Sequence, residues 1–231
     1  MTENSVRSRI AAIIPAYQEQ THIGEVVLRT RAQLEHVLVI DDGSIDKTAE
    51  RARVAGAEVV VHPQNQGKGE SIKTGLRHWL NREIDFVIIL DADGQHRPEE
   101  IDRFIAIANS STEAKLVLVN RMNDVVRMPR VRRLVNGYMS RQISRVCRQE
   151  IPDTQCGFRM LHRDLIPDLL GGAARFDYET EMLFIASQKG LRIQSVPIST
   201  VYSDEVSSIH PVRDTIRFVK LMRRYRRLSV S

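Results

Sequence analysis

The first half of the chain alternates between short apolar runs and segments with helical spacing, and this alternation is the feature that most restricts the possible fold. The runs are rich in β-branched residues and cover Ile10–Ile14, Val37–Ile40, Glu58–His62, Phe86–Leu90 and Leu116–Asn120. Between them, apolar side chains recur three and four positions apart, as at Ile101, Phe104 and Ala108. Strands that alternate with helices predict βαβ units and a mostly parallel sheet. The runs lack strict polar alternation, which is typical of strands covered on both faces.

The second half of the chain has a different pattern. Residues 130–148 predict an amphipathic helix with interspersed arginines, and Pro211–Leu228 predict a second basic amphipathic helix. A further helix is expected to begin near Asp177 and a short strand to cover Arg192–Ile198. We find no internal repeat, low-complexity segment or linker, so one α/β domain over residues 1–231 is predicted.

The net charge of +5 is unevenly distributed along an otherwise ordinary composition, 42% hydrophobic and 27% charged. Residues 121–150 and 213–227 each carry a net charge of +6, which leaves −7 for the rest of the chain. Such asymmetry indicates an anionic partner on one face, and a phosphorylated ligand, an anionic membrane or a nucleic acid would each fit. Two solvated helix faces are the alternative that composition leaves open.

Cysteine usage and the lack of long apolar runs indicate the cellular compartment in which the protein is expected. Cys147 and Cys156 fit neither a disulfide framework nor a Cys-x-x-Cys metal site. No apolar run reaches the length of about 18 residues that a spanning helix needs. The N-terminal "MTENSVRSR" has no signal-peptide core. We therefore expect a reduced, cytoplasmic protein.

Polar loops follow the predicted strands, with the sequences "PAYQEQ", "DDGS", "PQNQGKG" and "DADGQH". In open α/β sheets, ligands bind beyond the carboxyl ends of the strands, so these loops are expected to converge on one site. Asp91 and Asp93 are one residue apart on an extended stretch, which places both carboxylates on the same side. The pair predicts a site for a divalent cation that also binds phosphate, with Gln95 as a third oxygen ligand. Capping of local turns is the alternative for such a short motif.

Three other loops carry residues suited to a nucleotide. Asp41 and Asp42 end the second predicted strand, where a carboxylate can accept hydrogen bonds from a ribose or a base. Lys68 lies between two glycines, which let the backbone approach a ligand while the ammonium group attracts phosphate. After the first strand, Tyr17 is available for stacking and Glu19 for hydrogen bonding.

Taken together, "IIPAYQE", "VIDDGSIDKT", "NQGKGESIKTG" and "ILDADGQHRPEEI" resemble the donor half of family 2 glycosyltransferases. The downstream "NRM", "DTQCGFRM" and "FDYETEML" resemble the polyprenyl-phosphate sugar transferases of that family, a group that includes dolichyl-phosphate mannose synthase. The resemblance implies a GT-A (Rossmann-like) fold, with residues 10–120 as the nucleotide-sugar half and residues 121–231 as the acceptor half. It also implies inverting transfer from a nucleotide sugar. Because the processive motif QxxRW is missing, one sugar per cycle is expected.

The same resemblance implies roles for individual residues. Those implied to line the nucleotide sugar are Pro15, Tyr17, Glu19, Asp41, Asp42, Lys68 and Asp91. Those implied to hold Mg²⁺ or Mn²⁺ against the diphosphate are Asp91, Asp93 and Gln95. Those implied to carry catalysis are Asp93, Arg121 and Asp153. Arg121 matches a basic residue near the donor phosphates, and Asp153 matches an acid that serves as base towards a hydroxyl acceptor in many relatives.

A lipid phosphate is the acceptor that best explains the arginines. Its oxygen is already ionised near neutral pH, so it needs a general base less than a hydroxyl group does. Arg130, Arg132 and Arg133 are predicted to hold this phosphate through charge-assisted bonds. A basic amphipathic helix would lie on an anionic leaflet and present the prenyl chain. The chain lacks the C-terminal pair of spanning helices of many bacterial relatives, so peripheral attachment to the cytoplasmic membrane face, or a membrane-protein partner, is expected.

Several alternatives stay open at the level of sequence. The donor is a sugar nucleotide of the GDP-mannose or the UDP-glucose type, and a soluble hydroxyl acceptor would fit the same family. A catalytically silent nucleotide- or nucleic-acid-binding module is the alternative from another class. Only 5% of the residues are aromatic, which leaves few stacking platforms, so no nucleic-acid partner is predicted. A dehydrogenase is excluded because no GxGxxG motif follows a predicted strand.

Overall fold

The structure is a computed structural model that describes residues 7–110, 115–121, 130–171 and 177–198, together with Leu221, Met222 and Tyr225. Its strands are β1 (Ile10–Ala16), β2 (His36–Asp41), β3 (Glu58–Val61), β4 (Phe86–Ile89), β5 (Leu116–Asn120), β6 (Arg159–His162) and β7 (Ile193–Pro197). Its α-helices are α2 (Ile23–Arg31), α3 (Thr48–Val54), α4 (Lys68–Leu80), α5 (Ile101–Ser110), α6 (Arg130–Cys147), α7 (Ile166–Leu169) and α8 (Asp177–Gln188). Short 3₁₀ helices, η1 (Pro98–Glu100) and η2 (Arg163–Leu165), precede α5 and α7.

Within the described part of the chain, the strands form a seven-stranded sheet in the order β3-β2-β1-β4-β6-β5-β7. β1 runs parallel to both β2 and β4, and β5 runs parallel to β7. β6 is antiparallel to both of its neighbours, β4 and β5. The mostly parallel α/β sheet predicted from the alternating pattern is therefore confirmed, and β6 is a strand that the pattern did not predict.

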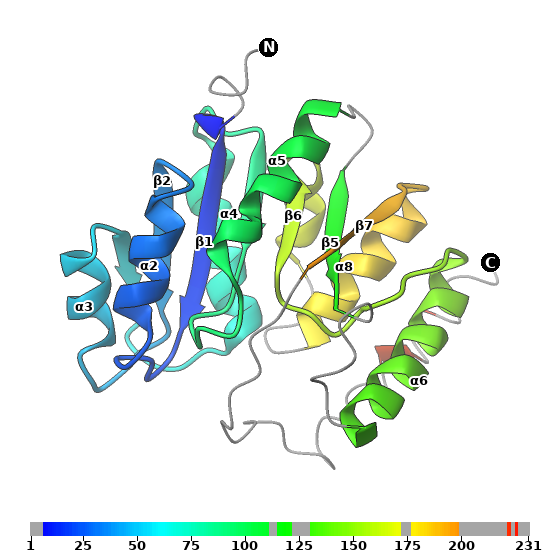
Figure 1. The fold of residues 1–231 in the computed structure, drawn as a ribbon, viewed down its shortest axis with the longest axis horizontal. Helices are drawn as coiled ribbons and strands as arrows, with labels where there is room; N and C mark the ends of the chain where they lie inside the picture. Colours follow the sequence, from blue (N-terminus) through cyan, green and yellow to red (C-terminus); the bar gives the residue numbers. More distant parts are fainter. Residues whose placement is uncertain are drawn as a thin grey trace.

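Helices cover both faces of the sheet, and a hydrophobic core lies on each face (Figure 1). On one face, Val26 of α2 and Phe104 of α5 pack with Ile14 of β1. On the other face, Leu76 of α4 packs with Ile13 of β1. Neighbouring residues of β1 thus enter opposite cores, because successive side chains of a strand point to opposite faces. This two-sided burial explains why the strand sequences are apolar throughout.

The helix predicted at residues 130–148 is present as α6, which lies towards the end of the sheet at which the arrow of β1 points (Figure 1). Further along the helix, Ile143 and Cys147 are buried. In the N-terminal half, however, Leu134, Val135 and Tyr138 are 74%, 50% and 62% exposed. These three residues form what we call the outer apolar patch of α6, and they do not join the core.

The helix predicted at Pro211–Leu228 lies largely outside the described residues. Three of its residues are described, and all three are buried. The Tyr225 hydroxyl donates a hydrogen bond to Glu181 Oε1 at 2.9 Å, and the rings of Tyr225 and Phe184 are 4.6 Å apart between centroids. Among the described helices, none is both long enough and apolar enough to cross a membrane.

Candidate active site

Asp42 joins the loop after β2 to the loop after β3. Its Oδ1 lies 2.7 Å from His62 Nδ1 and accepts a hydrogen bond from the Gln66 amide at 2.9 Å. Its Oδ2 accepts a hydrogen bond from the Gly67 amide at 2.7 Å. Asp42 is therefore buried among partners of the protein itself and shapes the turn that leads into α4. Its predicted contact with a base or ribose stays a prediction.

Gly43 allows these two loops to approach each other closely. Its φ is +76°, and a Cβ at this position would lie 2.6 Å from the carbonyl carbon of Gln64. Glycine meets both demands without strain. The preceding Asp41 accepts a hydrogen bond from the Ser44 amide at 3.0 Å, which further fixes the turn.

The loop after β1 reaches the same end of the sheet. The Glu19 amide donates a hydrogen bond to Thr48 Oγ1 at 2.9 Å, which ties this loop to the start of α3. Tyr17 is 45% exposed, whereas Pro15 is buried within β1. The structure thus brings the loops of the predicted nucleotide site together, while the contact of each residue with a nucleotide stays a prediction.

Lys68, the first residue of α4, lies between carboxylates from two other elements. Its Nζ is 2.5 Å from Asp91 Oδ1, just beyond β4, and 3.2 Å from Glu179 Oε1 on α8. Behind Glu179, the Nη2 atom of Arg159 on β6 lies 3.7 Å from the same Oε1. All four side chains are at least three quarters buried, so solvent screens these interactions weakly.

The charges at this centre change the acid strength of its carboxylates. Burial by itself raises the pKa of Asp91, but the charge of Lys68 and the interaction with His96 outweigh it and hold this pKa below the ordinary range. Burial likewise opposes protonation of Lys68, yet Asp91 and Glu179 raise the Lys68 pKa above its ordinary value. In contrast, burial and the negative charge of Asp91 raise the pKa of Asp93. Asp91 and Lys68 are therefore fully charged at neutral pH, whereas no ion pair of Asp93 occurs among the described residues.

The pair of Asp91 and Asp93 suits a divalent cation. No group of three or more His, Cys, Asp or Glu side chains that could hold a metal occurs in the described part of the chain, so ligand phosphates would complete the coordination. Asp91 Oδ1 is buried and, apart from its ion pair with Lys68, has no hydrogen-bond partner among the described residues. A cation here would also relieve the repulsion that raises the pKa of Asp93. Gln95 lies beside the pair, since its backbone N–H donates to Asp93 Oδ1 at 2.9 Å, but its role as a third ligand stays a prediction.

Gly157, from the "DTQCGF" segment, packs its backbone directly against this centre. A Cβ at Gly157 would lie 2.6 Å from Asp91 Oδ2 and 2.9 Å from Lys68 Nζ. A real Cβ does not approach other atoms so closely, so any other residue would push Asp91 or Lys68 away. The motif's glycine is thus explained in this chain by close backbone approach.

Arg121 and Asp153 form a buried, two-pronged ion pair. Arg121 Nε donates to Asp153 Oδ2 at 2.7 Å and Nη2 donates to Oδ1 at 3.1 Å. The Arg121 backbone amide also donates to Oδ2 at 3.3 Å, and the Asp153 side chain is fully buried. This geometry suits Asp153 to orienting the guanidinium group. The roles predicted for Asp153 as a base and for Arg121 near the donor phosphates stay predictions.

The arginines predicted to hold the acceptor phosphate lie in the first turn of α6. Among Arg130, Arg132 and Arg133, the structure describes only the side chain of Arg133, which is exposed. The preceding residues 122–129 lie outside the described residues. The acceptor role of these arginines therefore stays a prediction.

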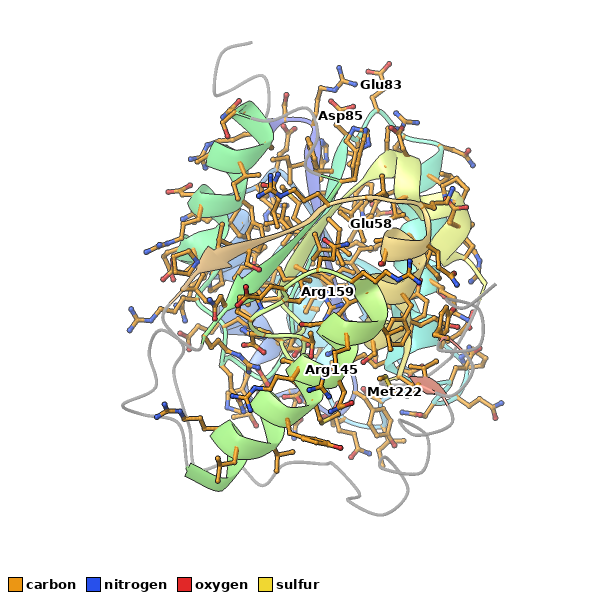
Figure 2. The ribbon with its side chains drawn as sticks, turned by 90° about the vertical axis from the view of Figure 1, so that its right-hand side faces the viewer. Glu58, Glu83, Asp85, Arg145, Arg159 and Met222 are labelled. Atoms are coloured by element: carbon orange, nitrogen blue, oxygen red, sulfur yellow. The ribbon has the colours of Figure 1, made fainter. Side chains whose placement is uncertain are left out.

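Glu179 and Arg159 are members of the site that sequence reasoning did not assign. Besides its proximity to Glu179 Oε1, Arg159 donates hydrogen bonds to the backbone carbonyls of Glu179 at 2.7 Å and of Cys156 at 2.6 Å. Figure 2 shows Arg159 inside the molecule, and it is 1% exposed. The signal in the sequence was the acidic residues of "FDYETEML", which stand in an otherwise apolar helix, but nothing in the pattern joined Glu179 to Lys68.

The chain matches the model of glycosyl transferase family 2 over residues 11–170, more than half of its length, and it belongs to that family. Within the family, its relatives include enzymes named for sugar transfer to dolichyl phosphate or undecaprenyl phosphate. It is 29% identical to the UDP-N-acetylglucosamine--dolichyl-phosphate N-acetylglucosaminyltransferase of Methanococcus voltae, over 84% of this chain and 86% of that one. It is also 28% identical to glycosyltransferase AglJ of Haloferax volcanii, over 93% of this chain and 71% of that one.

Solved structures confirm the expected GT-A fold. The glucosyl-3-phosphoglycerate synthase of Mycobacterium tuberculosis in complex with UDP superimposes with a TM-score of 0.76 at 19% identity, over 97% of this chain and 84% of that one. A complex of the same enzyme with Mn²⁺, UDP and glucosyl-3-phosphoglycerate superimposes with a TM-score of 0.69 at 19% identity, over 95% of this chain and 81% of that one.

Proposed function

We propose that this protein transfers one sugar, with inversion, from a nucleotide sugar to a polyprenyl phosphate. The observation that most supports this is the meeting of Lys68, Asp91 and Asp93 at the carboxyl end of β4, in a chain of family 2. The relative from Methanococcus voltae is named for transfer of a sugar to dolichyl phosphate, which supports the class of acceptor. The donor is proposed to be a UDP-sugar or a GDP-sugar.

The charges of the site suit the departure of a nucleoside diphosphate. Cleavage of a glycosyl–phosphate bond develops negative charge on the leaving group, and fixed positive charges stabilise it. Lys68 carries such a charge, and we propose that Arg121 adds a second one. Asp91 and Asp93 would hold Mg²⁺ or Mn²⁺, which when bound acts as a Lewis acid on the diphosphate. The Mycobacterium tuberculosis complex with Mn²⁺ and UDP supports this choice of cofactor.

An ionised lipid phosphate as nucleophile agrees with the surroundings of Asp153. Such an acceptor has already lost its proton near neutral pH, so transfer does not require a strong base. Both Asp153 oxygens accept hydrogen bonds from Arg121, which suits a carboxylate that orients a cation. We propose that Arg130, Arg132 and Arg133 at the start of α6 bind the acceptor phosphate.

α6 also supports peripheral attachment to an anionic membrane, which we propose to be the cytoplasmic face. Its outer apolar patch is followed along the helix by the exposed Arg141 and Arg145, the latter labelled in Figure 2. A helix that offers apolar and basic side chains on its solvent-facing side binds the boundary between headgroups and acyl chains. Anionic lipids strengthen this binding through the arginines.

Replacing Leu134 and Tyr138 with serine is expected to weaken binding to anionic vesicles by at least about tenfold, because burial of even one Leu-sized side chain contributes about 1.5–3 kcal/mol. Binding is measured by co-sedimentation with vesicles of phosphatidylglycerol and phosphatidylcholine. Leu28→Ser is the matched control, since Leu28 is a 60% exposed leucine on α2. If Leu28→Ser and the α6 variant bind equally well, α6 is not the attachment site.

The proposed function is tested by incubating the protein with Mn²⁺, a radiolabelled nucleotide sugar and an acceptor. UDP-glucose, UDP-N-acetylglucosamine and GDP-mannose are compared as donors, with undecaprenyl phosphate, dolichyl phosphate and 3-phosphoglycerate as acceptors. We expect label in the organic phase with one donor and a polyprenyl phosphate. Label on 3-phosphoglycerate alone would instead assign a soluble acceptor, and no transfer with any pair would contradict the proposal.

A further inference from the structure

Lys68 is held between two carboxylates, of which only Asp91 belongs to the predicted cation site. Its Nζ is 2.5 Å from Asp91 Oδ1 and 3.2 Å from Glu179 Oε1. Glu179 is fixed in turn, because Arg159 donates to its backbone carbonyl at 2.7 Å and is itself buried in β6. Of these two carboxylates, a cation would compete with Lys68 for Asp91 but not for Glu179.

Lys68 and a divalent cation compete for the same oxygen. Asp91 Oδ1 is buried, and the ammonium group of Lys68 lies against it at ion-pair distance. A cation at Oδ1 would repel the ammonium group, so Lys68 has to withdraw before Asp91 Oδ1 can serve as a ligand. In the structure, Lys68 thus supplies a counter-charge to Asp91.

The surroundings limit where Lys68 can go. The backbone of Gly157 closes one side, since a Cβ there would lie only 2.9 Å from Lys68 Nζ. On another side lies Glu179 Oε1, which is buried and, beyond its ion pairs, has no hydrogen-bond partner among the described residues. On leaving Asp91, Lys68 stays next to Glu179 and therefore beside the cation site.

We propose that Glu179 is a positioning residue that keeps Lys68 within the site when Asp91 turns to a cation, so that binding of the cation and of the diphosphate is coupled. The inference rests on the proposed function in one respect: it assumes that the ligand carries a diphosphate. Without that ligand, Lys68 occupies Asp91 and the cation binds weakly. With it, Lys68 moves from Asp91 towards the phosphate oxygens and still contacts Glu179, and the freed carboxylate accepts the cation.

The test measures Mn²⁺ affinity from the electron paramagnetic resonance signal of free Mn²⁺, alone and with saturating UDP or GDP. Lys68→Met is expected to tighten binding of Mn²⁺ alone about tenfold and to reduce the gain that the nucleotide brings, since linked sites lose their coupling when the link is removed. Lys68→Gln has the same expectation if Lys68→Met fails to fold. Glu179→Gln is expected to weaken binding of Mn²⁺ alone. Without the Glu179 carboxylate, Lys68 is attracted more strongly to Asp91 and competes better with Mn²⁺ for it.

A double variant separates this role from a direct effect of charge. If Glu179 acts through Lys68, the double variant Lys68→Met/Glu179→Gln binds Mn²⁺ with nearly the same affinity as Lys68→Met alone. If Glu179 instead attracts Mn²⁺ directly, adding Glu179→Gln still weakens Mn²⁺ binding. Lys47→Met, which removes the same charge at an exposed position, is expected to bind Mn²⁺ as the wild type does. An unchanged affinity in Lys68→Met, or a persisting effect in the double variant, overturns the inference.

The outcome is independent of the transfer assay. Coupled binding of Mn²⁺ and nucleotide that is lost in Lys68→Met supports the inference even if no polyprenyl phosphate is glycosylated. Transfer to a polyprenyl phosphate with unaltered Mn²⁺ affinities in the variants overturns the inference and leaves the proposed function intact. Failure of the wild type to bind Mn²⁺ with any nucleotide contradicts both the cation site and the inference.

Discussion

Replacing Asp93 with alanine is expected to lower sugar transfer by at least about 10³-fold while the protein stays folded. A metal ion that stabilises a leaving group contributes several kcal/mol, and each 1.36 kcal/mol corresponds to about a tenfold change in rate. EDTA is expected to produce the same loss in the wild type and to abolish donor binding. Both are measured with the radiolabelled transfer assay, and full activity of Asp93→Ala would exclude Asp93 as a metal ligand.

The folded state offers a second check on Asp93. Burial and the charge of Asp91 raise the pKa of Asp93, so the folded protein binds this proton more tightly than the unfolded chain does. The ionised carboxylate therefore destabilises the fold above the folded-state pKa, and this cost disappears as the pH falls below the unfolded-state pKa. Without metal, we expect Asp93→Asn to have a higher melting temperature than the wild type at neutral pH. At acidic pH, the two melting temperatures are expected to differ little. Glu83→Ala, at the opposite end of the molecule from α6 (Figure 2), is the control for both assays.

The parallel part of the fold was predictable because each strand there has a recognisable local sequence pattern. The apolar runs of β1, β2 and β4 are bounded by polar loops, and those loops lie together at one end of the sheet, as the topology requires. β6 was missed because "RMLH" is four residues long, with a charged residue first. Its strand conformation comes from pairing with β4 and β5, and neither partner is near it in sequence.

In the site, too, local sequence patterns were predictable and contacts between distant residues were not. Asp91 and Asp93 could be predicted as a cation site because two carboxylates stand one residue apart just after a buried strand. The ion pair of Lys68 with Glu179 joins residues more than a hundred positions apart, so no local spacing reveals it. For α6, the amphipathic pattern predicts that a helix forms, but it does not say which apolar residues meet the core. In the structure, Ile143 does so and Leu134 does not.

Removal of the Asp153 carboxylate by Asp153→Ala is expected to destabilise the protein by about 3–5 kcal/mol, the usual cost of removing one member of a buried ion pair. The partner left behind is Arg121, which is 5% exposed and would lose two side-chain hydrogen bonds at 2.7 and 3.1 Å. Urea denaturation measures the loss. Arg121→Ala is expected to cost a similar amount.

Replacing both partners distinguishes structural support from proton abstraction. Arg121→Met combined with Asp153→Leu is expected to recover much of the stability lost in either alanine variant, because an apolar pair of similar volume leaves no buried charge unpaired. If Asp153 positions Arg121, Asp153→Asn lowers stability and kcat together without removing the acidic limb of the pH–rate profile. If Asp153 is instead the base, Asp153→Asn removes that limb. A lipid phosphate that needs no base predicts the first outcome, so one conservative substitution tests the chemistry of the acceptor as well as the role of the pair.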